Sequence, residues 1–225
     1  MTPAERARMR DTLRTALRKS LLPESAPTHP GAFTPPEPVS PDTVERFTRE
    51  LTALGGTVHA VTGFEEIAAT VLAIVDAQET RRVLMWDEAA LPVSGLTARL
   101  AAAGVEICTE RPGDLASQER RQEWASASVG ITGADAGLIE TGSVVLASGP
   151  GRGRLASLLT PIHVALLSHA ALVRSLAVLI AERPDLVTQG SNLICITGPS
   201  RTADIEHTLS RGVHGPKEVH VVLYK

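Results

Sequence analysis

Short apolar runs alternate with amphipathic segments along the chain from residue 40 to residue 125. The apolar runs have the length of a buried strand, and between them apolar residues recur every three or four positions, as on one face of a helix. The pattern predicts strands at 57–61, 82–87 and 105–109 and helices at 41–54, 62–77, 91–103 and 114–125. This alternation is typical of an open, largely parallel sheet that is covered by helices on both faces.

The pattern changes at residue 128, where apolar runs follow one another more closely. The runs at 136–140 and 143–147 are separated only by Thr141 and Gly142, which predicts a hairpin or a tight bend. Further strands are predicted at 128–132, 161–167, 192–197 and 218–224, and one helix at 169–182. We therefore assign residues 40–225 to one α/β domain.

The first 39 residues follow a different pattern. Residues 4–22 are rich in Ala, Leu and Arg, and Leu13, Leu17 and Leu21 recur at a spacing of four, which predicts a helix. The prolines that follow exclude a regular helix or a central strand and indicate an extended arm. They stand at positions 23, 27, 30, 35, 36, 38 and 41. This arm either crosses to a partner subunit, as in a homo-oligomer, or straps its own domain, and the sequence favours neither alternative.

Composition narrows the class of protein. Hydrophobic residues make up 43% of the 225 residues but aromatic residues only 3%, so the core must consist of Leu, Val, Ile and Ala. A net charge of −3 and a pI of about 6.2 do not predict nucleic-acid binding. No apolar run is long enough to span a membrane. The N-terminus lacks the apolar core of a secretory signal, so we expect a cytoplasmic protein.

Cys108 and Cys195 are the only cysteines, and both lie in apolar runs, which predicts two buried structural thiols. Two cysteines cannot supply the four thiolates of an iron–sulfur cluster. The chain also lacks zinc-ligand spacing, so we expect no metal and no cofactor in this chain.

Polar residues that directly follow predicted strands are candidates for function, because ligands of open parallel sheets bind beyond the carboxyl ends of the strands. Asp135 follows the strand at 128–132, where it could hold a ligand hydroxyl, act as a base or only make turn hydrogen bonds. Glu140 precedes Thr141 and Gly142 inside an apolar hairpin. Burial would raise the pKa of this carboxyl and suit it to acid–base or nucleophilic work; a structural Glu bonded to N–H groups or an Arg is the alternative.

A second group of candidates follows the strand at 192–197. Gly198 begins a loop in which Ser200, Arg201 and Thr202 precede Asp204, and small hydroxyl residues predict the start of a short helix. Backbone N–H groups at a helix start, together with an Arg, can bind a carboxylate or phosphate; a simple helix cap is the alternative.

Two loops complete the set of candidates. His214 lies between Gly212 and Pro216, where its ring could transfer a proton or bind substrate. The glycine-rich, basic loop at 149–154 could close over an anion, although a solvated loop is the simpler interpretation of its sequence.

Four strings of this chain together resemble the lactate utilisation (LUD) domain. They are Ile-Thr-Gly-Ala-Asp-Ala-Gly-Leu-Ile-Glu-Thr-Gly-Ser at 131–143, Leu-Leu-Thr-Pro-Ile-His at 158–163, Gly-Pro-Ser-Arg-Thr-Ala-Asp-Ile-Glu at 198–206 and Gly-Val-His-Gly-Pro at 212–216. The resemblance covers residues 40–225, and residues 1–39 carry none of it. It implies a three-layer α/β/α fold of the NagB/RpiA/CoA-transferase-like type. It also implies a role in oxidising L-lactate to pyruvate in bacteria, alongside two partner proteins that bear iron–sulfur clusters.

The resemblance also sets the functional alternatives. The main hypothesis is a component of a lactate-oxidising system that has no redox centre of its own and binds a small carboxylate or phosphate. In it, Ser200, Arg201 and Thr202 hold the anion, while Asp135, Glu140 and His214 supply hydrogen bonds or transfer protons. Sugar-phosphate isomerases share a Gly-Ala-Asp motif and CoA transferases use a Glu nucleophile, so an independent enzyme using Glu140 is one alternative. A non-catalytic interaction module is the other.

Overall fold

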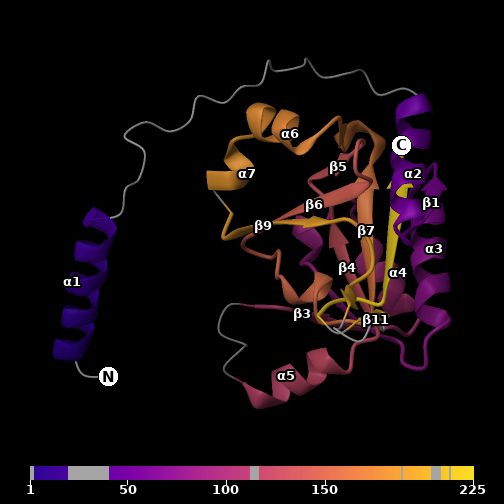
Figure 1. Cartoon of the computed structure of the whole chain (residues 1–225). Coiled ribbons are helices and arrows are strands. Elements are labelled where there is room, and N and C mark those ends of the chain that lie inside the picture. The colour runs from indigo at the N-terminus through magenta and orange to yellow at the C-terminus, as the bar shows by residue number, and fades with distance from the viewer. Residues whose placement is uncertain (1–2, 20–40, 112–116, 189, 204–208, 213) are drawn as a thin grey trace. The chain divides into compact units, whose positions relative to one another are not determined.

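The structure, a computed structural model, describes residues 3–19, 41–111, 117–188, 190–203, 209–212 and 214–225 (Figure 1). The chain divides into two compact units, Met1–Thr34 and Pro35–Lys225. The described part of the first unit is helix α1 (Pro3–Lys19), as the leucine spacing predicts. The predicted proline arm falls on residues 20–40, outside the described residues.

The larger unit is built on a six-stranded sheet. Its order is β1-β12-β7-β4-β2-β3, and every neighbouring pair is parallel. The strands are β1 (Thr57–Val61), β2 (Arg82–Met85), β3 (Glu106–Thr109), β4 (Val129–Gly133), β7 (Ile162–Ser168) and β12 (Glu218–Tyr224). The parallel sheet predicted from the alternating pattern is therefore confirmed.

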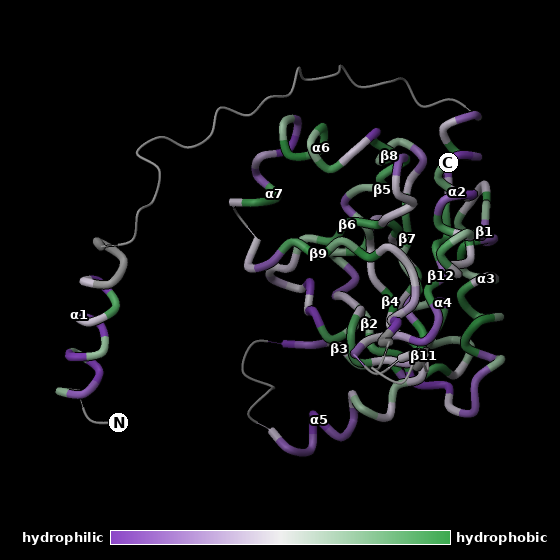
Figure 2. Tube along the Cα trace, in the orientation of Figure 1, coloured by the Kyte–Doolittle hydropathy of each residue, from purple (hydrophilic) through white to green (hydrophobic). Residues whose placement is uncertain are grey.

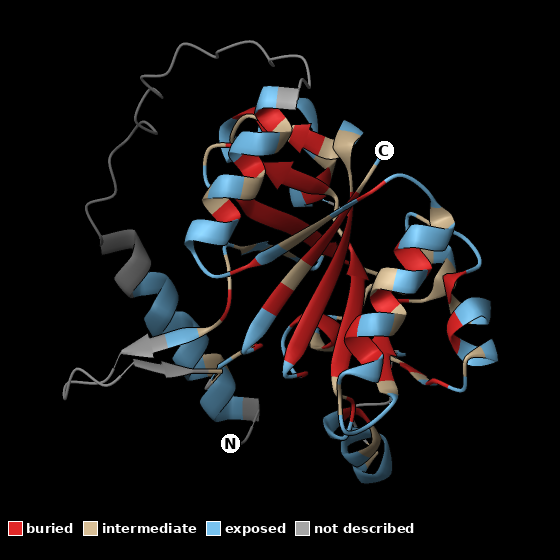
Figure 3. Cartoon of the chain, turned by 90° about the vertical axis from the view of Figure 1, so that its right-hand side faces the viewer, coloured by how far each residue is buried: buried red, intermediate tan, exposed pale blue. Residues whose placement is uncertain are grey.

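Helices and a second sheet cover the two faces of this sheet. Helices α3 (Phe64–Asp76) and α4 (Leu96–Ala102) pack together on one face, and α2 (Pro41–Ala53) lies with the second sheet on the other (Figure 3). Hydropathy follows this layering, because the central strands and the inner helix faces carry the apolar residues (Figure 2). Helix α5 (Gln118–Ala125) follows β3 and buries Trp124. The three-layer α/β prediction is confirmed.

The second sheet has four strands in the order β8-β5-β6-β9. Strands β5 (Ala136–Leu138) and β6 (Ser143–Ser148) form the predicted antiparallel hairpin, and β6 also pairs with β9 (Asn192–Ile196). All six residues of β6 are buried. The second sheet therefore has its core along β5 and β6 and its edges at β8 and β9.

The predicted helix at 169–182 is wrong in its first half. Residues His169–Ala171 form a 3-10 turn, η4, and Leu172–Val173 form strand β8, which pairs with Gly137 and Leu138 of β5. Ser175 then caps helix α6 (Leu176–Glu182) through its side chain. Pairing with β5 overrides the local helix pattern at β8.

Short elements complete the domain. They are η1 (Glu88–Ala90), η3 (Leu155–Ser157), α7 (Asp185–Thr188) and the antiparallel strands β10 (Arg201–Ala203) and β11 (Leu209–Arg211). Within the described ranges, no helix is both long and apolar enough to cross a membrane.

Candidate functional site

The carboxyl ends of β2, β3 and β4 meet at one edge of the parallel sheet. Trp86 follows β2, Glu110 follows β3, and Asp135 lies two residues beyond β4. The loop at 149–154, which continues from β6, contacts all three. This edge is where open parallel sheets bind ligands, and the sequence placed Asp135 there correctly.

The loop at 149–154 begins with a tight turn. Gly149 and Arg152 bond to each other through both backbone groups, with N···O distances of 3.3 and 2.9 Å, and Gly151 has a φ of 70°. Pro150 and Gly151 at the two central positions are the residues that a type II turn favours. The Gly151 carbonyl accepts a hydrogen bond from the backbone N–H of Asp87 at 2.9 Å. The loop is therefore anchored to the sheet edge, while Pro150 and Arg154 are exposed to solvent.

Asp135 is held at both carboxylate oxygens. Oδ2 accepts the backbone N–H of Ala147 at 2.7 Å, and Oδ1 forms an ion pair with Nη1 of Arg152 at 2.7 Å. Its side chain is 9% exposed, whereas that of Arg152 is 34% exposed. The Asp135 side chain is nearly buried and both of its oxygens already have partners. Its role is therefore to orient Arg152 and not to bind a ligand itself.

Arg152 is a partly exposed charged group at this edge. Its guanidinium lies over the ring of Trp86, 5.2 Å from the ring centroid, while Nε1 of Trp86 donates to the Gly153 carbonyl at 2.9 Å. A guanidinium has five N–H donors, and Asp135 occupies the Nη1 end. Arg152 therefore combines a fixed position with donors that suit a carboxylate or phosphate.

Two cavities meet at Arg152. The smaller has a volume of about 150 Å³ and the larger about 390 Å³. The smaller is lined by Trp86, Ala89, Ala90, Leu91, Pro92, Gly133, Ala134, Asp135 and Arg152. The larger is lined by Glu110, Arg111, Ser148, Ser191 and the loop 149–154. A Cβ atom on Gly133 would lie 2.8 Å from Pro92, so the glycine keeps the smaller cavity open.

Glu140 is not the buried carboxylate that the sequence predicts. It lies in the turn after β5 with its side chain 34% exposed, and its Oε1 accepts a hydrogen bond from Nε of Arg174 at 2.8 Å. It corresponds to the alternative weighed above, a Glu satisfied by an Arg. Asp135 and Glu140 flank β5 on opposite sides, on the order of 15 Å apart at the usual rise of a strand. The two carboxylates therefore do not share a site.

The residues of the turn around Glu140 make contacts that have a structural role. The hydroxyl of Thr141 is 2.7 Å from that of Ser143, which is 3.0 Å from that of Thr197. Gly142 has a φ of 62°, and a Cβ atom there would lie 2.2 Å from the backbone nitrogen of Leu51 in α2. Gly142 is therefore required by its conformation and by the close approach of α2.

The predicted short helix after Gly198 is wrong, because Arg201–Ala203 is strand β10 and pairs with β11. Within the described residues 198–203, no helix start is present to bind an anion. The guanidinium of Arg201 donates to the Leu54 carbonyl at the end of α2, and the backbone of Ser200 bonds to Pro216 and Gly212 at 2.8 and 3.0 Å. The side chain of Thr202 and all of Asp204 lie outside the described residues.

His214 is exposed and lies in the same loop region, because its neighbour Gly215 approaches the side chain of Ser200. The nearby Lys217 bonds through its N–H to the Pro161 carbonyl at 2.7 Å, at the amino ends of β7 and β12. His214 and Ser200 are therefore brought together as expected, but at the sheet edge opposite Asp135. The single cleft expected to hold Asp135, Glu140 and His214 is not present.

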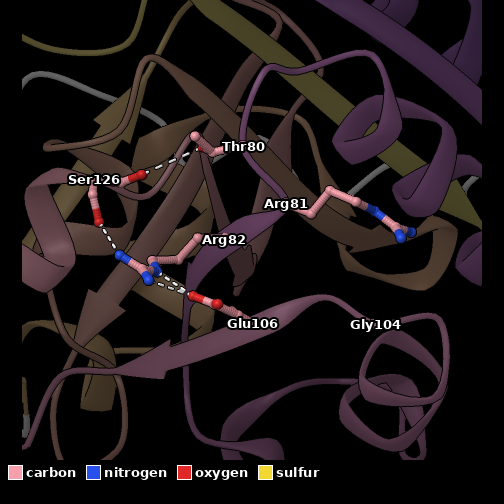
Figure 4. Close-up of a pocket in the computed structure, with 6 residues that line it drawn as sticks. All are labelled: Thr80, Arg81, Arg82, Gly104, Glu106 and Ser126. Atoms are coloured by element: carbon pink, nitrogen blue, oxygen red, sulfur yellow. Dashed lines mark hydrogen bonds and ion pairs between the residues drawn. The ribbon is translucent and has the colours of Figure 1, made fainter.

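A further pocket, of about 270 Å³, lies at the amino ends of β2 and β3 (Figure 4). Its arginines are already paired. Nε of Arg82 donates to Glu106 at 2.6 Å, and Arg81 forms an ion pair with Asp76 at 2.8 Å. Carboxylates thus neutralise its cations, so this pocket suits an anion poorly.

His163 is the most perturbed titratable group near the sheet centre. It is fully buried on β7, and its Nε2 lies 2.9 Å from the hydroxyl of Thr132 on β4. Burial lowers the pKa of His163 from 6.5 to about 3, so the ring is neutral. Neutral His163 is therefore a structural polar group inside the core.

Sequence reasoning missed Trp86 and included Arg152 only as part of the basic loop at 149–154. Gly-Pro-Gly before Arg152 was a usable signal of a fixed turn, and Trp86 lies near the carboxyl end of the strand predicted at 82–87. Among the cysteines, Cys108 is buried as predicted, but Cys195 is exposed on β9. In the described part of the chain, no cluster of three or more His, Cys, Asp or Glu residues has the arrangement of a metal site.

Comparisons with known proteins agree with the resemblance. The LUD domain model matches residues 44–224. Lactate utilization protein C of Halalkalibacterium halodurans is 35% identical over 147 residues, which are 64% of this chain and 62% of that protein, so the chain spans less than two thirds of it. Lactate utilization protein C of a Geobacillus species (strain WCH70) is 32% identical over 165 residues, 70% of this chain and 68% of that protein. A crystal structure of a DUF162 family protein from Deinococcus radiodurans matches with a TM-score of 0.60 and 20% identity, covering 84% of this chain and 100% of that one. That match shows the fold alone.

Proposed function

The chain belongs to the LUD domain family, and from this membership we propose that it serves a bacterial system that oxidises L-lactate to pyruvate. Several relatives carry the name lactate utilization protein C, and two of them match 64% and 70% of this chain. This shared name is the observation that carries the proposal.

In this proposal the chain binds a small carboxylate at the carboxyl edge of the sheet. Arg152 is the group that would hold it, because its guanidinium is fixed by Asp135 and Trp86 and borders both cavities. Arg201 is less suited, since it already donates to the end of α2. The anion site thus moves from the loop after Gly198, where the sequence placed it, to the loop at 149–154.

The electrons of the oxidation would pass to partner proteins that carry iron–sulfur clusters. Lactate oxidation releases two electrons, and the two cysteines of this chain cannot ligate a cluster with four thiolates. The role of the chain would be to position lactate or pyruvate in an assembly whose other subunits provide the redox centres.

The test combines growth with binding. Deletion of the gene should abolish growth on L-lactate, and wild type and Arg81→Ala should restore it, whereas Arg152→Ala should not. Arg81 is the matched control because it is also paired with one Asp, on the opposite edge. Isothermal titration with L-lactate, pyruvate and inorganic phosphate should show weaker binding of the carboxylates by Arg152→Ala only.

Other results would redirect the proposal. Normal growth of the deletion strain on L-lactate would refute the pathway. Full complementation and unchanged carboxylate binding by Arg152→Ala would refute the site. Loss of function in Glu140→Gln, with folding intact, would favour an independent enzyme that uses Glu140. Complementation by both variants would favour an interaction module.

A further inference from the structure

Strand β9 is an edge strand whose composition is unusual for an edge. In the described residues its only strand neighbour is β6, so the backbone groups along its other side have no ladder partner. Its sequence, Asn-Leu-Ile-Cys-Ile, has no charge and no proline, and neither do Ser191 and Thr197 that flank it. Proteins usually protect an open edge with charged residues, prolines or bulges, because bare edges pair with other strands.

The exposure of the β9 residues also indicates an edge that nothing in the described residues covers. None of its five residues is buried, whereas all six residues of the neighbouring β6 are. Cys195 pairs with Val145, and Val145 packs in one apolar cluster with Leu186 of α7, so the Cys195 side chain lies on the face that α7 covers. Val187 of α7 is 51% exposed.

We infer that β9 pairs with β9 of a second copy of this chain, in antiparallel orientation, to form a continuous eight-stranded sheet. A strand is complementary to its own copy in this arrangement, and the two-fold axis perpendicular to the sheet leaves each face on its own side. The α7 helices of both copies then lie on one face, where their Val187 side chains extend the apolar contact. An uncharged strand introduces no like-charge repulsion across the axis.

The pairing has a defined register. Pairing over the full strand places Ile194 on the two-fold axis and Cys195 opposite Leu193 of the second copy. The two Cys195 side chains then lie diagonally across the axis, about 7–8 Å apart. This separation is too long for a disulfide but is within reach of a short bismaleimide.

Replacing Cys195 by residues of opposite charge tests the pairing directly. Sedimentation equilibrium of the full chain should show a monomer–dimer equilibrium, and Cys195→Lys and Cys195→Glu should each raise the dissociation constant about tenfold or more. An equimolar mixture of the two variants should regain the dimer, because opposite charges then lie diagonally across the axis, within reach of each other. Leu158→Lys, at an exposed apolar position away from β9, should change the constant less than about twofold.

Cross-linking and a second variant complete the test. A short bismaleimide should link wild-type chains through Cys195 and fail in Cys195→Ser, since Cys108 is buried. Val187→Lys should weaken the dimer as well, with circular dichroism confirming the fold of each variant. A chain that is monomeric at all concentrations, or a dimer that none of the β9 and α7 substitutions weakens, would overturn the inference.

Discussion

Protonation of His163 should destabilise the domain in mild acid. The ring is fully buried, and burial lowers its pKa in the folded state from 6.5 to about 3. As the pH falls below about 6.5, His163 is protonated in the unfolded chain but stays neutral in the folded chain. The free energy of unfolding therefore falls as the pH drops from about 6.5 toward 3. The loss from this group is about 1.4 kcal/mol at pH 5.5 and about 2.7 kcal/mol at pH 4.5.

The measurement is the free energy of unfolding in urea at pH 7.5, 5.5 and 4.5, for wild type and His163→Gln. Gln cannot titrate but can still reach the hydroxyl of Thr132, which His163 contacts at 2.9 Å. His59 and His169 also have lowered pKa values, because of burial, and their contributions cancel in the difference between the two proteins. The free energy of unfolding of the variant, minus that of wild type, should rise by about 2.7 kcal/mol from pH 7.5 to pH 4.5. A constant difference would refute the assignment of a buried neutral ring.

Three further predictions concern the site and its surroundings. Gly142→Ala should lower the free energy of unfolding by roughly 3 kcal/mol, from its positive φ and its clash with α2, in urea titrations. Asp135→Asn should lower it by about 1–2 kcal/mol, and should also weaken carboxylate binding because Arg152 loses the group that orients it. A thiol reagent should label one thiol, Cys195, in the dilute native chain and both after unfolding, since burial raises the pKa of Cys108 to about 11.

The central sheet could be predicted because the local sequence alone identifies its strands. Each is a short apolar run between turn residues, and parallel strands buried on both faces have that pattern. Strand β8 could not be found in this way. Leu172 and Val173 precede a good helix, and only their pairing with Gly137 and Leu138, far earlier in the chain, makes them a strand.

The candidate site depends even more on distant contacts. Arg152 gains its role from Asp135, 17 residues earlier, and from the Trp86 ring, while Glu140 loses its predicted burial to an ion pair with Arg174, 34 residues later. A carboxylate in an apolar segment signals that a partner exists, but it does not reveal whether that partner is a ligand or an arginine of the same chain.

The two edges of the parallel sheet use their polar groups differently, and this difference supports the proposed ligand site at the carboxyl edge. At the amino edge, Ser200 and Lys217 bond to the backbone of other loops, and Arg82 is paired with Glu106. The conspicuous strings around Ser200 therefore join loops to one another. At the carboxyl edge, one carboxylate and one tryptophan ring hold Arg152 in place and leave it bordering two cavities. A guanidinium fixed before a ligand arrives loses less freedom on binding, which supports the proposal that a carboxylate binds at the edge that holds Arg152.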